Sequence, residues 1–178
     1  AQMKQGAFGS HGTSCAGVAA AGADNADKGA GVCPNCTILP RLLGTSVGGS
    51  FQVSDKDIAD GFVELVDAGA WVVSNSWGPG NGNPIYADSN LPQPALSAVR
   101  KAAFDYAETK GRDGKGTVIV FASGNSNATM DTQSAYTTNV AVTAVNDLGF
   151  KSYYSSFGPA ADIAAPSSGG LKGIVTTA

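Results

Sequence analysis

One histidine and one asparagine are the residues of this sequence whose types and surroundings could support catalysis. His11 is the only histidine of the chain and opens a segment rich in Ala and Gly. Its imidazole titrates near neutral pH and could serve as a general base, or it could simply pack at the end of a helix. Asn125 follows an apolar run and Gly124, where a strand would leave a sheet. Its amide could donate a hydrogen bond to a developing oxyanion, or it could hold a left-handed turn.

The composition limits the class of protein in which these residues act. The chain has 178 residues, 43% of them hydrophobic and 14% charged, which suits one globular domain without linkers or repeats. A net charge of −3, with no run of Lys or Arg, argues against nucleic acid or an anionic membrane as a partner. The longest apolar stretches are well short of the ~18 residues that a membrane span requires.

The elements expected to position His11 lie in the first half of the chain. The small residues of 11–23 predict a tightly packed helix, and 37–43 predicts a short buried strand. Ser54, with Asp57 three residues later, resembles a capping box that opens a second helix, and a strand over 71–76 follows. The apolar side chains of that helix share one face: Ile58, Phe62, Leu65 and Val66.

A further helix and strand would position Asn125 after a proline-rich loop over 79–94. The helix carries apolar side chains on one face, namely Leu96, Val99, Ala103 and Tyr106, and turns charged ones to water, namely Arg100, Lys101, Asp105 and Glu108. The run 117–122 is apolar on both faces, as a central parallel strand covered by helices on both sides would be. Two short strands over 139–145 and 162–165 follow. The alternation predicts an α/β fold with three layers, α/β/α, and a mainly parallel central sheet.

Four segments, taken in their order and separation, resemble the subtilisin-like serine proteases. They are His11-Gly12-Thr13, Gly31-Val32-Cys33-Pro34-Asn35, Ser76-Trp77-Gly78-Pro79 and Phe121-Ala122-Ser123-Gly124-Asn125. The third segment, and the stretch from Gly111-Arg112-Asp113 through the fourth, look closer to the kexin and furin branch than to subtilisin itself. The resemblance spans nearly the whole chain. It implies a subtilisin-like fold and a serine endopeptidase that works through an Asp-His-Ser triad and an Asn oxyanion hole.

The resemblance also implies a role for each matching residue. His11 would be the general base that takes a proton from a nucleophilic serine and returns it to the leaving amine. Asn125 would stabilise the tetrahedral oxyanion. The other implied residues bind substrate: Ser76, Trp77 and Gly78 as an added β-strand, Ser123 and Gly124 as walls of the primary specificity pocket, and 48–51 as the opposite strand of the cleft.

Two parts of the family pattern are not found at their expected places. The family has a catalytic Asp on a strand before the histidine, but the ten residues before His11 include no acidic residue. The family serine lies in a Gly-Thr-Ser motif after the last strands; Gly44-Thr45-Ser46 has these letters but follows an early strand. We therefore expect residues 1–178 to be an internal part of a catalytic domain, inactive by itself. The alternative is an inert protease homologue that binds peptides.

Ligands and partners follow from the same resemblance. Kexin-like enzymes hold acidic groups and calcium near the specificity pocket, and Asp131 stands at one such position, with a solvated turn residue as the alternative. Asn81 and Ser156 stand where two other acids would be, so we do not expect a preference for paired basic residues. The resemblance allows a structural calcium ion and no organic cofactor. It implies a secreted monomer whose partner is a polypeptide substrate.

The cysteines allow more than one interpretation. Cys33-Pro34-Asn35-Cys36 has the spacing of a redox or zinc motif. Zinc would need two more ligands, and a dithiol oxidoreductase would carry the motif at the start of a helix rather than before a strand. Because family members usually hold small residues in a loop here, we expect a disulfide between Cys33 and Cys36, with two free thiols as the alternative. Cys15 matches a cysteine found beneath the catalytic histidine in some relatives, or is a buried small hydrophobe.

A papain-type cysteine protease is the other peptidase class considered, because Asn75-Ser76-Trp77-Gly78 also occurs around that family's asparagine. Its nucleophilic cysteine would precede the histidine by a long stretch, and only ten residues precede His11. We therefore disfavour this class.

Overall fold

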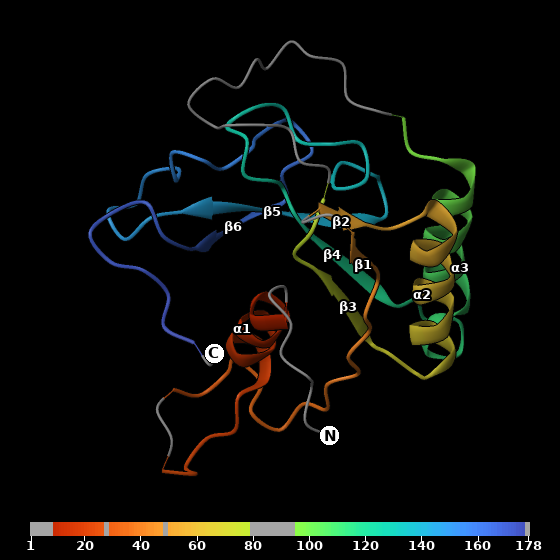
Figure 1. Ribbon diagram of the computed structural model, residues 1–178, viewed down its shortest axis with the longest axis horizontal. Coiled ribbons are helices and arrows are strands. Elements are labelled where there is room, and N and C mark those ends of the chain that lie inside the picture. The colour runs from red at the N-terminus through yellow and green to blue at the C-terminus, as the bar shows by residue number, and fades with distance from the viewer. Residues whose placement is uncertain (1–8, 27–28, 48–49, 79–94, 177–178) are drawn as a thin grey trace.

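The computed structural model describes residues 9–26, 29–47, 50–78 and 95–176, and the proline-rich loop with Asn81 lies outside them. Three helices and six strands are assigned in this part of the chain (Figure 1). The helices are α1 (Gly9–Ala20), α2 (Asp55–Asp67) and α3 (Ala98–Gly114). The strands are β1 (Thr45–Val47), β2 (Ser50–Gln52), β3 (Val72–Asn75), β4 (Val118–Ala122), β5 (Asn139–Val145) and β6 (Ile163–Pro166).

The central sheet has four parallel strands in the order β3-β4-β5-β6. Strand β4 lies between two parallel neighbours, which confirms the central position predicted from its apolar sequence. Strand β5 has the predicted bounds, and β6 is shifted by one residue. Strands β1 and β2 form a separate antiparallel hairpin. The predicted cleft strand over 48–51 overlaps β2, while 48–49 lie outside the described residues.

Helices α2 and α3 cover one face of this sheet. The predicted capping box is present at the start of α2, where Ser54 Oγ accepts from Asp57 N and the Asp57 carboxylate accepts from Ser54 N. Three buried rings form the centre of the layer. The ring centroids of Phe62 and Phe104 lie 4.9 Å apart, and those of Phe104 and Phe121 lie 5.9 Å apart. Burial of such a ring contributes roughly 1.5–3 kcal/mol, so this cluster fixes both helices on β4.

Helix α1 lies on the opposite side of the sheet (Figure 1). This face is more open, since Val72 is 56% and Val118 41% exposed. The C-terminal segment reaches α1, where Thr176 Oγ1 donates to Ser14 O at 2.6 Å. With helices on both sides of a parallel sheet, the architecture is the predicted α/β/α. Among the described residues, no helix combines the length and the apolar character needed to cross a membrane.

The strand predicted over 37–43 is wrong. These residues have no regular secondary structure, and Leu42 is 78% exposed. An extended segment becomes a stable strand only when a neighbour satisfies its backbone N–H and C=O groups. No strand among the described residues pairs with this segment. The apolar residues of 37–43 gave no information about whether a neighbouring strand would pair with the segment.

The predicted faces of α3 need a correction as well. The buried side of this helix is centred on Ala103, Phe104 and Ala107, whereas Val99 is exposed. One residue corresponds to about 100° of rotation around a helix, so a small error in centring the apolar stripe moves a whole face. Arg100, predicted to face water, is therefore only partly exposed.

Candidate active site

The carboxyl ends of β3 and β4 meet at one edge of the sheet. The two strands are parallel, and Asn75 lies beside Phe121 in the register. The chain therefore leaves the sheet at this edge twice, as segment 76–78 and as segment 122–125. Ligands of open α/β sheets bind at the carboxyl ends of the strands. The segments predicted to bind substrate and to carry the oxyanion donor thus share one location in the fold.

Asn75 holds segment 76–78 from within the core. Its buried amide donates through Nδ2 to Val73 O and to Val120 O, both at 3.1 Å. Its Oδ1 accepts from Trp77 Nε1 at 3.1 Å. The Trp77 ring packs edge-on against Phe121, with centroids 5.3 Å apart. A buried amide whose hydrogen bonds are made on both sides fixes the direction in which the chain leaves β3.

His11 reaches the same segment from the first turn of α1. Its Nε2 lies 2.8 Å from Ser76 O. Because a carbonyl oxygen only accepts, Nε2 is the donor in this contact and carries a proton. The imidazole is exposed, and Cys15 Sγ, one helical turn further on, lies 3.8 Å from Nε2. The only histidine of the chain therefore stands beside the predicted substrate strand.

The bend that leads to Asn125 is held by a second segment, 152–157. Ser156 N donates to Gly124 O at 2.9 Å, and Ser123 Oγ donates to Ser156 O at 3.0 Å. Gly124 has a φ of +104°, and a Cβ built on it would stand 3.1 Å from Ser156 Oγ. The left-handed backbone and the close contact both favour glycine at this position. Asn125 follows with its side chain exposed at the sheet edge.

Asp131, the predicted metal ligand, is buried with 6% exposure and stabilises the turn that follows it. Its Oδ1 accepts from Gln133 N at 2.9 Å and from Ser134 N at 3.0 Å. Calcium takes about six to eight oxygen ligands, and no group of three or more His, Cys, Asp or Glu side chains occurs in the described part of the chain. The side chains around Asp131 do not by themselves make a calcium site. Its role as a ligand stays a prediction, and we assign no step to the ion.

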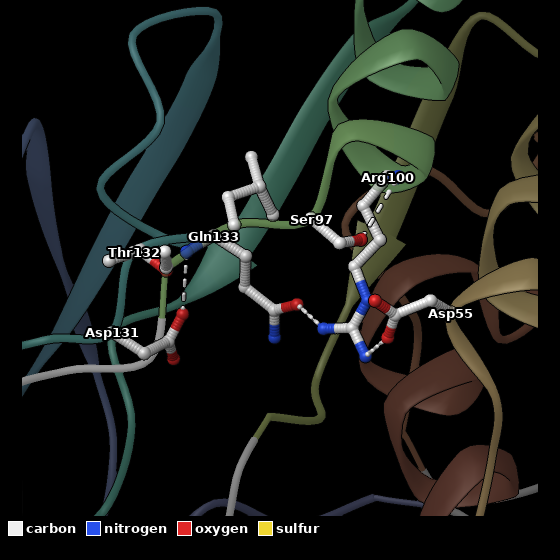
Figure 2. Close-up of a pocket in the computed structure, with 8 residues that line it drawn as sticks. Asp55, Ser97, Arg100, Asp131, Thr132 and Gln133 are labelled. Atoms are coloured by element: carbon white, nitrogen blue, oxygen red, sulfur yellow. Dashed lines mark hydrogen bonds and ion pairs between the residues drawn. The ribbon is translucent and has the colours of Figure 1, made fainter.

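A cavity of about 300 Å³ lies between the first turns of α2 and α3 and the loop after β4 (Figure 2). Arg100 crosses its wall, with Nη2 2.7 Å from Asp55 Oδ1 and Nη1 donating to Gln133 Oε1 at 2.9 Å. A hydrogen bond from Ser97 and the Arg100 guanidinium hold the pKa of Asp55 below its ordinary value. The cavity therefore has a paired charge along one side. Its lining residues are Asp55, Ala95, Leu96, Ser97, Arg100, Asp131, Thr132 and Gln133.

The loop after α1 carries a disulfide between Cys33 and Cys36, whose Cα atoms lie 5.3 Å apart. Of the three cysteines in the sequence, Cys15 is the free one. The loop folds back on the helix, and Cys33 N donates to Ala19 O at 2.9 Å. The disulfide therefore braces the segment that packs against the end of α1, the helix that carries His11.

A parallel α/β/α sheet that brings a histidine and a Gly-Asn bend to one edge defines a subtilisin-like fold. The chain belongs to the subtilase family, whose sequence model, described as "Subtilase family", matches residues 2–177. It is 40% identical over 169 residues to the calcium-dependent protease of Trichormus variabilis, covering 90% of this chain and 24% of that protein. It is 36% identical over 160 residues to thermitase of Thermoactinomyces vulgaris, covering 89% of this chain and 49% of thermitase. Proprotein convertase subtilisin/kexin type 6 of Homo sapiens is 31% identical over 152 residues, and the match covers 81% of this chain and 14% of the convertase.

The resemblance derived from the sequence is thus confirmed at the level of the family. Kexin-like proteases are among the relatives, and thermitase and the calcium-dependent protease share a higher identity with this chain. The chain spans about a quarter of the length of the calcium-dependent protease and about half that of thermitase.

Solved structures show the same fold. The S218A mutant of the protease domain of PatA superimposes with a TM-score of 0.68 at 21% identity, covering 94% of this chain and 55% of that one. MycP1 with its N-terminal propeptide removed has a TM-score of 0.65 at 21% identity, covering 88% and 52%. The predicted fold class is confirmed.

Sequence reasoning missed two residues that shape this edge of the sheet. Asn75 could have been found, since an Asn at the end of an apolar strand, two residues before a Trp, has few ways to satisfy its amide. Gln133 carried no such signal. Its partner Arg100 lies 33 residues away in the sequence, and nothing local to either residue predicts that they meet.

Proposed function

We propose that the whole protein that carries this chain is a serine endopeptidase in which His11 is the general base. The observation that carries the proposal is the position of His11 Nε2, 2.8 Å from the backbone of the substrate strand, in a chain of the subtilase family. The nucleophilic serine and the orienting carboxylate would come from parts of the whole protein other than residues 1–178.

The chemistry of His11 depends on which ring nitrogen carries the proton. A general base must accept the serine proton on a free nitrogen, but here Nε2 donates to Ser76 O. A carboxylate that accepts from Nδ1–H would fix the other tautomer and leave Nε2 free. His11 would then take the proton from the serine Oγ as that atom attacks the scissile carbonyl. It would later give the proton to the leaving amine.

Asn125 and segment 76–78 supply the other two functions in the proposal. The exposed amide of Asn125 would donate to the oxyanion that forms when the carbonyl becomes tetrahedral. Segment 76–78 would bind the peptide backbone as an added β-strand, supported by the anchoring of Trp77 on Asn75. Ser123 and Gly124, tied to Ser156, would line the pocket for the side chain next to the scissile bond.

The proposal also covers the class of substrate, the location of the whole protein and its metal ion. The substrate is a polypeptide, and the whole protein is secreted, which suits the Cys33–Cys36 disulfide because disulfides persist in oxidising surroundings. One relative is named a calcium-dependent protease, and a structural calcium ion in the whole protein is proposed on that name alone.

The test compares the whole protein with the 178-residue chain on one chromogenic peptide ester. We expect the whole protein to hydrolyse the ester and to lose this activity with a serine-directed phosphonylating inhibitor. The 178-residue chain should show no turnover above buffer, because a histidine without its serine and carboxylate retains no triad chemistry. Inhibitor-sensitive hydrolysis by the short chain would contradict the assignment of the missing residues. An inactive whole protein that binds peptides would favour an inert homologue.

A further inference from the structure

The cavity between α2, α3 and the loop after β4 contains a hydrogen-bond donor that has no partner among the described residues. Gln133 is 2% exposed, and its Nε2 is one of the buried polar atoms for which the described residues provide no hydrogen bond. A buried donor without an acceptor costs free energy, and native structures rarely leave one unless a ligand or water supplies the missing partner. The unpaired amide nitrogen points to an acceptor group that is bound from outside.

The orientation of the Gln133 amide follows from its neighbour. Arg100 Nη1 lies 2.9 Å from the amide, and a guanidinium only donates, so the atom that faces it is the oxygen. The nitrogen is therefore turned away from Arg100, as Figure 2 shows. Arg100 is held in turn by its ion pair with Asp55 at 2.7 Å. This chain of contacts, Asp55 to Arg100 to Gln133, fixes the donor in the cavity.

The Gln133 donor lies close to the predicted substrate strand. A Cβ built on Gly78 would stand 3.6 Å from Gln133 Nε2 and 3.3 Å from Asp131 Oδ2. A donor and an acceptor thus approach the same point of the backbone from the cavity side. Gly78 is two residues beyond Ser76, whose carbonyl contacts His11. An extended chain advances about 3.3 Å per residue, so the cavity begins about 7 Å from Ser76 along the strand. A peptide bound along 76–78 could place one side chain there.

The charges around the cavity limit the chemistry of that side chain. Asp55 and Arg100 compensate each other, which leaves the Asp131 carboxylate as the excess charge. A carboxylate ligand would meet this negative charge, and an apolar side chain would leave Gln133 Nε2 unpaired. A primary carboxamide matches both groups, because its oxygen accepts from Gln133 and its NH₂ can donate toward Asp131.

We infer that this cavity selects an Asn or Gln side chain of the bound peptide, with Gln133 as the specificity-determining residue and Arg100 as the residue that positions it. The inference rests on the proposed function, since it takes the ligand to be a peptide bound along 76–78. It goes further by naming the side-chain class and the residue that recognises it.

The test measures binding rather than cleavage, so that it does not depend on activity. The whole protein carrying His11→Ala is titrated with acetylated alanine-based peptide N-methylamides, which have no primary carboxamide at the C-terminus, and in which one position at a time is Gln, Met, Glu or Lys. At one position we expect Gln to bind about tenfold more tightly than the nearly isosteric Met, with Glu weaker than Gln. Equal dissociation constants for Gln and Met at every position, or no binding by any peptide, would overturn the inference.

Two variants of Gln133 separate recognition from folding. Gln133→Met removes the donor and should bring the Gln-to-Met ratio close to one. Gln133→Glu keeps an acceptor for Arg100 and presents an acceptor in place of the donor, so binding of the Lys peptide should rise several-fold. The matched control is Glu108→Gln, an exchange of the same two groups at an exposed position of α3, which should leave all ratios unchanged. A Gln preference that survives Gln133→Met would assign recognition to another residue. If the wild-type whole protein did not hydrolyse the ester but the Gln preference was observed, only the proposed function would be contradicted.

Discussion

We expect replacement of His11 with alanine in the whole protein to lower kcat for a peptide substrate by about 10⁶-fold, the size of effect known for loss of the triad histidine in subtilisin. In the proposed mechanism, loss of the imidazole would leave no group to accept the serine proton during attack or to protonate the leaving amine. His11 is the only histidine among residues 1–178, so no second imidazole in this part of the whole protein could take over its role. The measurement is initial rates over a range of peptide concentrations, which separates kcat from KM.

The control for this experiment lies on the same helix. Val18 is exposed on α1, and Val18→Ala should leave kcat within about twofold of the wild type, as surface changes of this kind usually do. A kcat for His11→Ala within tenfold of the wild type would show that another group is the base.

We expect replacement of Asn125 with alanine to lower kcat by about 10² to 10³, with KM changed little. In the proposed mechanism the amide would bond to a charge that develops only in the transition state, so its loss would raise the barrier without weakening ground-state binding. The exposed position of Asn125, after a glycine bend held by Ser156, leaves the side chain free for this role. The matched control is Asn35→Ala in the exposed loop between the two bonded cysteines.

The two kinetic constants decide the interpretation of Asn125. A rise in KM with kcat unchanged would mean that the amide binds the ground state of the substrate, and the oxyanion role would be wrong. If Asn35→Ala also lowered kcat by a similar factor, the loss in Asn125→Ala would reflect a general effect on folding instead.

Much of the fold was predictable because its signals are local. The capping box of Ser54 and Asp57 identified the start of α2, and the run 117–122, apolar on both faces, identified the central strand. The apolar segment 37–43 failed as a strand because its state depends on a neighbour that the segment itself does not specify. The exposed position of Val99 on α3 shows the same limit, since a helix face is set by what packs on it.

The candidate site was predictable to the extent that short motifs carry it. The segments around His11, Ser76 and Asn125 were predicted from their order and spacing, and the structure places His11 beside Ser76 although the two lie 65 residues apart. The contacts that support them were not found. Arg100 has the pattern of a solvent-facing residue in the sequence, and only the packing of α2 beside α3 places Asp55 within 2.7 Å of it. Such pairs depend on tertiary structure and leave no local pattern.

The claim that His11 is the catalytic base can be tested most directly with a peptide chloromethyl ketone on the whole protein. The peptide delivers the reagent to the cleft, where a ring nitrogen of the base displaces chloride and becomes alkylated. The protein should carry Cys15→Ala, because the Cys15 thiol lies 3.8 Å from His11 Nε2 and would compete for the reagent. We expect mass spectrometry to find one adduct, on His11, whose formation slows when excess substrate peptide is present. An adduct elsewhere in the protein, or alkylation of His11 at the same rate with and without competing peptide, would contradict the account.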